Sequence, residues 1–254
     1  MTWFVTEEGY ELFFNRDELN TRSQALPPSI QSTQIDVDNA ISYISPTDTD
    51  AGGTWIAVNE FGFSICLLNH YQFEQIPTYK NWISRGEVVR QFVITSDLNN
   101  AESQFMNMDL NDYRAFRMFI IERSGQNRLF VWDGHQARVE RNVTSPKSSS
   151  SVDAKNVKEY RKKLFFDLNL AERKNTQSYL NYHSSHIPIK SKASVCMHRK
   201  DASTVSLSVI KANAESVSFA YADGSPCEVE ISPPISLNLL IDDPVSKKNR
   251  LAMP

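Results

Sequence analysis

Cysteine is scarce in this sequence. The three cysteines, Cys66, Cys196 and Cys227, lie far apart and form no Cys-x-x-Cys pair. This spacing argues against a disulfide framework and against a four-cysteine zinc site. We therefore expect reduced thiols and no metal site.

The sequence also lacks long apolar runs, internal repeats and an excess of basic residues. No stretch approaches the roughly 18 apolar residues of a transmembrane helix, and no internal period indicates a solenoid. The first residues lack the basic and apolar regions of a secretory signal, so a cytoplasmic location is expected. A net charge of −3 and a pI near 6.0 give no reason to expect nucleic acid. The basic segment Lys155 to Lys163 is interpreted as the solvent-facing side of a helix.

What the sequence does contain is enough apolar material for a substantial core. Its 254 residues are 41% hydrophobic and 11% aromatic. A chain of this size can bury one large core, and we expect a single domain over residues 1–254.

Antiparallel strands are predicted at both ends of the chain. β-rich runs at Thr2 to Thr6 and Tyr10 to Asn15 flank a turn and predict an N-terminal hairpin. A second hairpin is predicted from Thr54 to Val58 and Phe63 to Leu68. The polar, proline-containing segment Gln24 to Thr49 is interpreted as a long loop with one short strand near Ile41 to Ile44. Further strands are predicted at Phe116 to Ile121, Leu129 to Trp132, Gln136 to Glu140, Val195 to His198, Thr204 to Lys211 and Ser216 to Ala222.

Helices are predicted between these groups of strands. Ser84 is a candidate N-cap and Glu87 closes a capping box, which predicts a helix from Arg85 to Ile94. A second helix is predicted by apolar residues that recur at helical spacing, namely Val157, Tyr160, Leu164, Leu168 and Leu170. A third is predicted around Asn175 to His183. The pattern indicates an α+β class, and we infer two sheets packed face to face with helices outside them.

Three motifs in order carry a family resemblance. They are Asn15-Arg16-Asp17-Glu18, Gly52-Gly53-Thr54-Trp55 and Arg85-Gly86-Glu87, and the segment Ser194 to Arg199 adds a C-terminal match. Together they resemble the family named for its Asn-Arg-Asp-Glu motif, which includes the Transport and Golgi organisation proteins. The resemblance implies an N-terminal nucleophile hydrolase-like αββα sandwich of four layers with two mostly antiparallel sheets, related to conjugated bile acid hydrolases and penicillin V acylases.

The resemblance also implies site residues. Arg16 is placed to hold a carboxylate with both arms of its guanidinium, with Asp17 beside it, and Asn69 is placed to help form an oxyanion hole. Relatives usually begin Met-Cys, and removal of the methionine exposes the cysteine as the nucleophile. This chain begins Met1-Thr2-Trp3, so the candidate nucleophiles are Thr2 and a cysteine upstream in a slightly longer gene product.

Each motif also has a structural interpretation. Arg16 and Asp17 can pair with neighbours at a strand end, and Asn69 can satisfy backbone groups there. The Gly-Gly-Thr-Trp and Arg-Gly-Glu motifs are interpreted as structural, because glycine relieves backbone crowding and Glu87 belongs to a capping box.

Histidine offers few metal ligands. Cys196 and His198 fall on one side of a predicted strand, and His183 and His186 on one face of a helix. Two ligands without a third make a weak zinc signal. His70 is kept as a candidate ligand-binding residue because it directly follows Asn69.

Two functions are compatible with these residues. The first, implied by the resemblance, is binding and intracellular trafficking of haem or a related hydrophobic ligand. Asn15, Arg16, His70 and His198 are then the ligand-binding candidates, and haem donor or acceptor proteins are the expected partners. The alternative is an amide hydrolase that uses an N-terminal nucleophile with Arg16, Asp17 and Asn69. No catalytic metal, nucleic acid or transmembrane segment is expected in either case.

Overall fold

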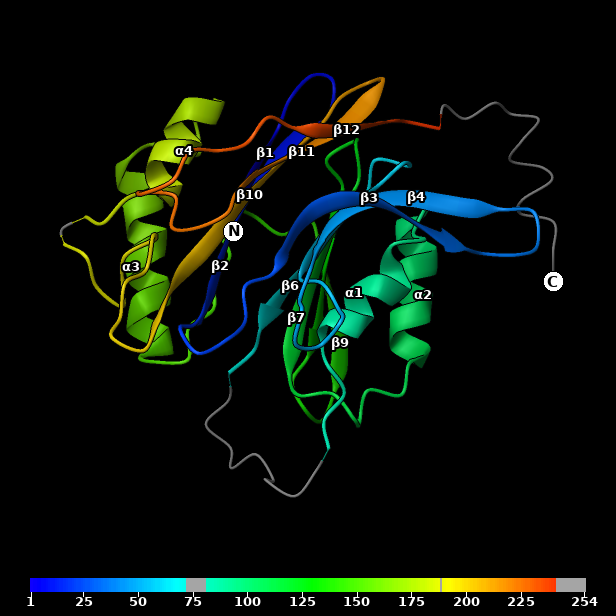
Figure 1. Ribbon diagram of the computed structural model, residues 1–254, viewed down its shortest axis with the longest axis horizontal. Helices are drawn as coiled ribbons and strands as arrows, with labels where there is room; N and C mark the ends of the chain where they lie inside the picture. Colours follow the sequence, from blue (N-terminus) through cyan, green and yellow to red (C-terminus); the bar gives the residue numbers. More distant parts are fainter. Residues whose placement is uncertain (72–80, 188, 241–254) are drawn as a thin grey trace.

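Two antiparallel sheets lie face to face in the computed structural model, with helices covering both outer surfaces (Figure 1). The structure describes residues 1–71, 81–187 and 189–240. The first sheet has the order β1 (Thr2–Val5), β2 (Tyr10–Leu19), β10 (Ala202–Ala212), β11 (Ser216–Ala222) and β12 (Ile235–Asn238). The second has the order β3 (Leu26–Gln34), β4 (Ala40–Thr47), β5 (Ile56–Asn59), β6 (Ser64–Asn69), β7 (Phe116–Ile121), β8 (Asn127–Trp132) and β9 (Ala137–Arg141). The helices are α1 (Gly86–Phe92), α2 (Leu98–Asn107), α3 (Ala154–Asp167) and α4 (Thr176–His183).

The main core fills the space between the sheets. Side chains alternate across each strand, so Trp3 and Leu12 of the first sheet meet Ile56 and Phe119 of the second. The Trp3 and Phe119 rings lie 4.3 Å apart between their centres. This contact fixes β1, and with it the start of the chain, against the second sheet.

The outer faces of the two sheets are buried by different helices. α1 and α2 pack Phe92 and Phe105 against Phe130 of the second sheet. On the other side, Phe13 of β2 contacts Tyr179 of α4, with ring centres 5.2 Å apart. Figure 1 shows the resulting order of layers: α3 and α4, the first sheet, the second sheet, then α1 and α2. The predicted α+β sandwich is confirmed.

Most predicted elements are present. Both hairpins, the three-stranded meander of β7, β8 and β9, and the two helices α3 and α4 form as expected. α1 is shorter than predicted, and Ser84 Oγ accepts a hydrogen bond from the Gly86 N–H rather than from Glu87. The strand β2 runs through Asn15-Arg16-Asp17-Glu18 instead of ending there.

Two predictions about secondary structure were wrong, and two elements were not predicted. Gln24 to Thr49 contains the hairpin of β3 and β4 rather than a loop with one short strand. β3 is an edge strand, where exposed polar residues and prolines are tolerated. Val195 to His198 forms no strand; its backbone groups bond to Ser185, Ser191 and Thr204. α2 and β12 were not predicted at all.

The predicted single domain extends over residues 241–254, which lie outside the described residues. Within the described part of the chain, no helix has both the length and the apolar character needed to cross a membrane.

Candidate functional site

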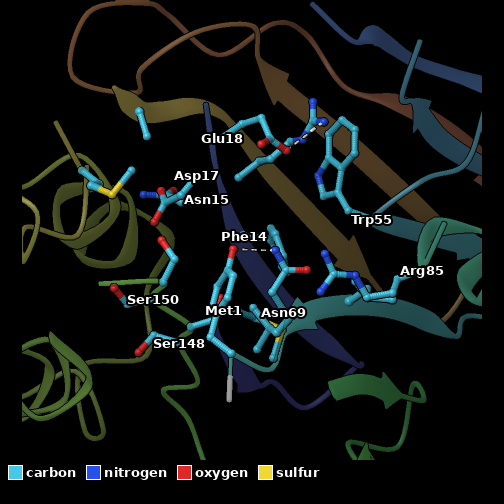
Figure 2. A pocket seen from close by; sticks show the side chains of 18 of the residues that line it. Met1, Phe14, Asn15, Asp17, Glu18, Trp55, Asn69, Arg85, Ser148 and Ser150 are labelled. Carbon is cyan, nitrogen blue, oxygen red and sulfur yellow. Dashed lines mark hydrogen bonds and ion pairs between the residues drawn. The ribbon is translucent and has the colours of Figure 1, made fainter. Parts of the chain in front are cut away.

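A cavity of about 450 Å³ opens between the two sheets at the end where β2 and β6 finish. Its walls come from β2, β6, the turn before β5, the start of α1, the loop before α3 and the segment before β10 (Figure 2). The described lining residues include Met1, Phe14, Asn15, Arg16, Asp17, Glu18, Arg22, Asp48, Trp55, Asn69, Tyr71, Trp82, Arg85, Arg114, Lys147, Arg161, Tyr182, His183, Met197 and Arg199.

Because side chains alternate along β2, the residues of the Asn-Arg-Asp-Glu motif face in two opposite directions at the cavity. Phe13 faces the helices and Phe14 faces the sheet-to-sheet core, so Asn15 and Asp17 point toward α3 and α4. Arg16 and Glu18 point toward the second sheet. The partner strand β10 has an irregular register opposite this segment, between Thr204 and Ser206, and such bulges change the aim of neighbouring side chains.

Arg16 is buried and held from several directions. Its guanidinium lies 4.0 Å from the centre of the Trp55 ring, a cation–π contact. Its Nη2 is 3.3 Å from Asp48 Oδ2 and 3.5 Å from Glu18 Oε2. Asp48 also receives a 2.5 Å bond from Arg22. Burial lowers the pKa of Arg16, while Glu18 and Asp48 act to raise it.

Asp17 belongs to a separate polar group. Its Oδ2 is 3.3 Å from Arg161 Nη2 of α3, and its Oδ1 accepts a 2.6 Å hydrogen bond from Thr204 Oγ1. Arg161 is buried, so this pair ties α3 to the first sheet at the cavity wall. Asp17 lines the cavity with both oxygens already engaged.

The Thr2 hydroxyl does not reach the cavity. It lies 2.8 Å from His183 Nε2, and His183 Nδ1 lies 2.9 Å from Asn15 Oδ1, within a buried group between β1, β2 and α4. Because side chains alternate along β1, Met1 and Trp3 face the space between the sheets and Thr2 faces the helices. The structure therefore does not support Thr2 as the nucleophile.

Met1, rather than Thr2, is among the described residues that line the cavity. Its amino group donates a 3.0 Å hydrogen bond to the carbonyl of Lys147. Burial, reinforced by Arg161, lowers the pKa of this amine to about 5.

The two glycine motifs contact each other directly. A Cβ on Gly53 would lie 2.8 Å from the Gly86 carbonyl carbon, and a Cβ on Gly86 would lie 2.9 Å from Thr54 N. Only glycine allows this approach. The structural interpretation of both motifs thus has a geometric basis, and their neighbours Trp55 and Arg85 reach the cavity because of it.

Asn69 and His70 have different positions. Asn69 lines the cavity at the end of β6, and its Nδ2 donates a 2.8 Å hydrogen bond to the Tyr71 hydroxyl. His70 is not among the described lining residues. Burial, followed by the positive charge of Arg117, lowers the pKa of His70.

His198 lies outside the cavity, in a cluster with His186, Cys196 and Cys227.

His183 and His186 do not share a helical face, because α4 ends at His183 and His186 lies in the following loop. Burial lowers the pKa of His183 well below its usual value.

Many of the cationic residues that line the cavity were not predicted from the sequence. Seven cationic side chains and three carboxylates are among the described lining residues. The cations are Arg16, Arg22, Arg85, Arg114, Lys147, Arg161 and Arg199; the carboxylates are Asp17, Glu18 and Asp48. Four of the seven cations, Arg22, Arg114, Lys147 and Arg161, come from segments with no recognisable motif, so their meeting depends on the tertiary structure.

Solved structures similar to this chain include N-terminal nucleophile hydrolases. A variant of conjugated bile acid hydrolase from Clostridium perfringens is similar with a TM-score of 0.54 at 12% identity, covering 92% of this chain and 96% of that one. The Caenorhabditis elegans ortholog of N-acylethanolamine-hydrolyzing acid amidase gives a TM-score of 0.53 at 10% identity, covering 80% and 87%. The chain therefore has the fold of that hydrolase class.

The sequence defines the family more narrowly. The sequence model of Transport and Golgi organisation 2 matches residues 3–214, and the chain belongs to this family. A search of curated proteins gives no match.

Proposed function

We propose that the cavity binds an anionic, amphipathic small molecule, that haem is this ligand, and that the protein passes it on without chemical change. The observation that carries the proposal is the charge of the lining. The chain has a formal net charge of −3, yet the described cavity lining has seven cationic side chains against three carboxylates. A cationic concave site in an acidic protein favours an anionic ligand.

Aromatic side chains on the cavity wall support an amphipathic ligand. Trp55, Trp82 and Phe14 supply flat apolar surface. Trp55 Nε1 is buried and has no hydrogen-bond partner among the described residues, so it is not itself offered to a ligand. Haem has a flat apolar ring and two propionates, so its carboxylates pair with arginines while its ring lies against the aromatic side chains.

Weak ligation of the iron supports transfer rather than storage. His183 is the only histidine among the described lining residues, and both of its ring nitrogens are already bonded. His70 and His198, proposed from the sequence as ligands, lie outside the described lining. The iron would meet at most a thioether or phenol, such as Met197 or Tyr71. We therefore expect an affinity of about 1 μM or weaker, which suits exchange with donor and acceptor proteins in the cytoplasm.

Titration of the full chain with ferric haem tests this proposal. The Soret band should shift and saturate with one haem per chain. Arg85→Gln should weaken binding about tenfold by removing a lining cation, while the exposed Arg138, outside the cavity, provides the matched control Arg138→Gln. A Soret shift that is absent, or equal weakening in both variants, would contradict the proposal. Melting temperatures of both variants show whether Arg85→Gln remains folded.

Amide hydrolysis is a second candidate, favoured by one observation. Asn69 places an amide donor on the cavity wall of a hydrolase-type scaffold. The Thr2 hydroxyl faces the helices, so this reaction requires another nucleophile. We expect no amine release from a conjugated bile acid or an N-acylethanolamine by this chain. Turnover that disappears in Asn69→Ala would favour the hydrolase instead.

A further inference from the structure

Two histidines and two cysteines meet beside the cavity wall, on the first sheet's side. They come from three segments: His186 follows α4, Cys196 and His198 precede β10, and Cys227 follows β11. One ligand atom from each residue lies within 4.8 Å of those of the other three. Cys196 is fully buried and the other three are partly buried.

His198 Nε2 is the centre of this cluster. It lies 3.0 Å from His186 Nε2, 3.5 Å from Cys196 Sγ and 3.3 Å from Cys227 Sγ, and the two sulfurs are 3.5 Å apart. A ring nitrogen carries one proton or one lone pair, so it makes one of these three interactions at a time. Hydrogen bonding therefore does not account for the convergence of all four atoms.

A metal ion accounts for all of these distances together. Tetrahedral zinc binds sulfur at about 2.3 Å and imidazole nitrogen at about 2.0–2.1 Å, which separates neighbouring ligand atoms by about 3.3–3.8 Å. Four of the six separations between the ligand atoms are 3.0–3.5 Å, close to these edges, and all six are within 4.8 Å. A disulfide is a poorer match, because it needs the sulfurs about 2.0 Å apart.

We propose that His186, Cys196, His198 and Cys227 bind one zinc ion in a closed, tetrahedral structural site. Two thiolates and two neutral imidazoles form a ligand set that binds zinc in preference to hard cations such as Mg²⁺. Binding displaces one proton from each thiol and leaves the charge of the metal balanced by two sulfurs. All four positions come from protein, so the zinc holds the segments together and takes no part in reactions.

The position of this cluster gives zinc a role in shaping the cavity. Val195 and Met197 flank Cys196 and line the cavity. The Val195 carbonyl accepts a 3.0 Å hydrogen bond from Asn15 Nδ2, and the Met197 N–H donates a 2.8 Å bond to Thr204 Oγ1. This segment forms no strand, so few ladder bonds hold it. Bound zinc would hold Val195 and Met197 in place at the cavity wall, where no strand or helix does so.

Metal analysis of the full chain, expressed without a histidine tag in zinc-supplemented medium, tests this inference. Elemental analysis after dialysis should give about one zinc per chain. Cys196→Ser/Cys227→Ser should lose the metal, and Cys66→Ala should keep it because Cys66 lies in the core between the sheets. A folded wild-type chain without zinc, or a double variant that retains it, would overturn the proposal.

Cobalt bound to the wild-type chain gives a readout that does not depend on how any variant folds. Replacing zinc by Co²⁺ in the wild-type chain should produce visible bands of tetrahedral cobalt and ultraviolet bands of cobalt bound to thiolate. His186→Asn should alter the visible bands and release the metal to a chelator at least about tenfold faster. Octahedral cobalt without thiolate bands, or an intact mass showing a Cys196–Cys227 disulfide in the native protein, would refute the site.

Discussion

The Arg16 guanidinium lies 4.0 Å from the centre of the Trp55 ring, while its Nη2 is 3.3 Å from Asp48. This geometry joins the Asn-Arg-Asp-Glu motif to the Gly-Gly-Thr-Trp motif. Arg16 therefore faces the cavity and also belongs to a buried ion pair, so its two sequence interpretations are both compatible with the structure.

Substitutions at Arg16 should separate these two roles. Arg16→Lys keeps the charge but loses the planar stack on Trp55 and the forked donor, so ligand binding should weaken more than stability. Arg16→Ala should lower the free energy of unfolding by about 1–2 kcal/mol, less than for an isolated buried pair, because Arg22 still pairs with Asp48. Chemical denaturation beside haem titration measures both effects. Normal ligand binding by Arg16→Lys would assign the residue to folding alone.

His183 should make stability depend on pH. Burial lowers its pKa well below the value of 6.5 that applies in the unfolded chain. Below about pH 6.5 the unfolded state therefore binds more protons than the folded state, and stability should fall as pH falls. The slope contributed by this group is at most about 1.4 kcal/mol per pH unit.

The test compares the pH dependence of His183→Gln with that of the wild type. Denaturation from pH 7.5 to 5 should give a flatter profile for His183→Gln than for wild type. Parallel profiles for His183→Gln and wild type would show that another group controls the acid sensitivity.

The contact between Gly53 and Gly86 should not tolerate a methyl group at either position. A Cβ there would come within 2.8–2.9 Å of backbone atoms, so Gly53→Ala and Gly86→Ala should each cost about 1–3 kcal/mol. Because the two glycines touch, the double variant should cost less than the sum of the singles. Near-neutral single variants in urea denaturation would show that the two loops separate easily.

The sequence predicted the fold where apolar periodicity was strong. The two predicted hairpins, β1 with β2 and β5 with β6, consist largely of buried residues, whereas β3 has an exposed Ile30 and two adjacent prolines and resembles a loop. α2 could have been found, because Leu98, Ala101 and Phe105 lie on one face behind the Asp97 cap.

The site was predictable only where a motif marks it. Asn15, Arg16, Asp17 and Asn69 all line the cavity. Arg22, Asp48 and Arg114 carry no local signal, because they meet only after the sheets pack. For the same reason Cys196 and His198 gave only half of the metal cluster, whose other members lie in distant segments.

The cationic lining of the cavity should select an anionic, flat ligand. Fluorescence titration with iron-free protoporphyrin IX and with its dimethyl ester tests this most directly, since the two share the same macrocycle and esterification with methyl groups removes both carboxylate charges. We predict that the free acid binds at least about tenfold more tightly, and that this preference shrinks at high salt. Equal affinity for acid and ester, or no quenching by either, would contradict the proposed selection by charge.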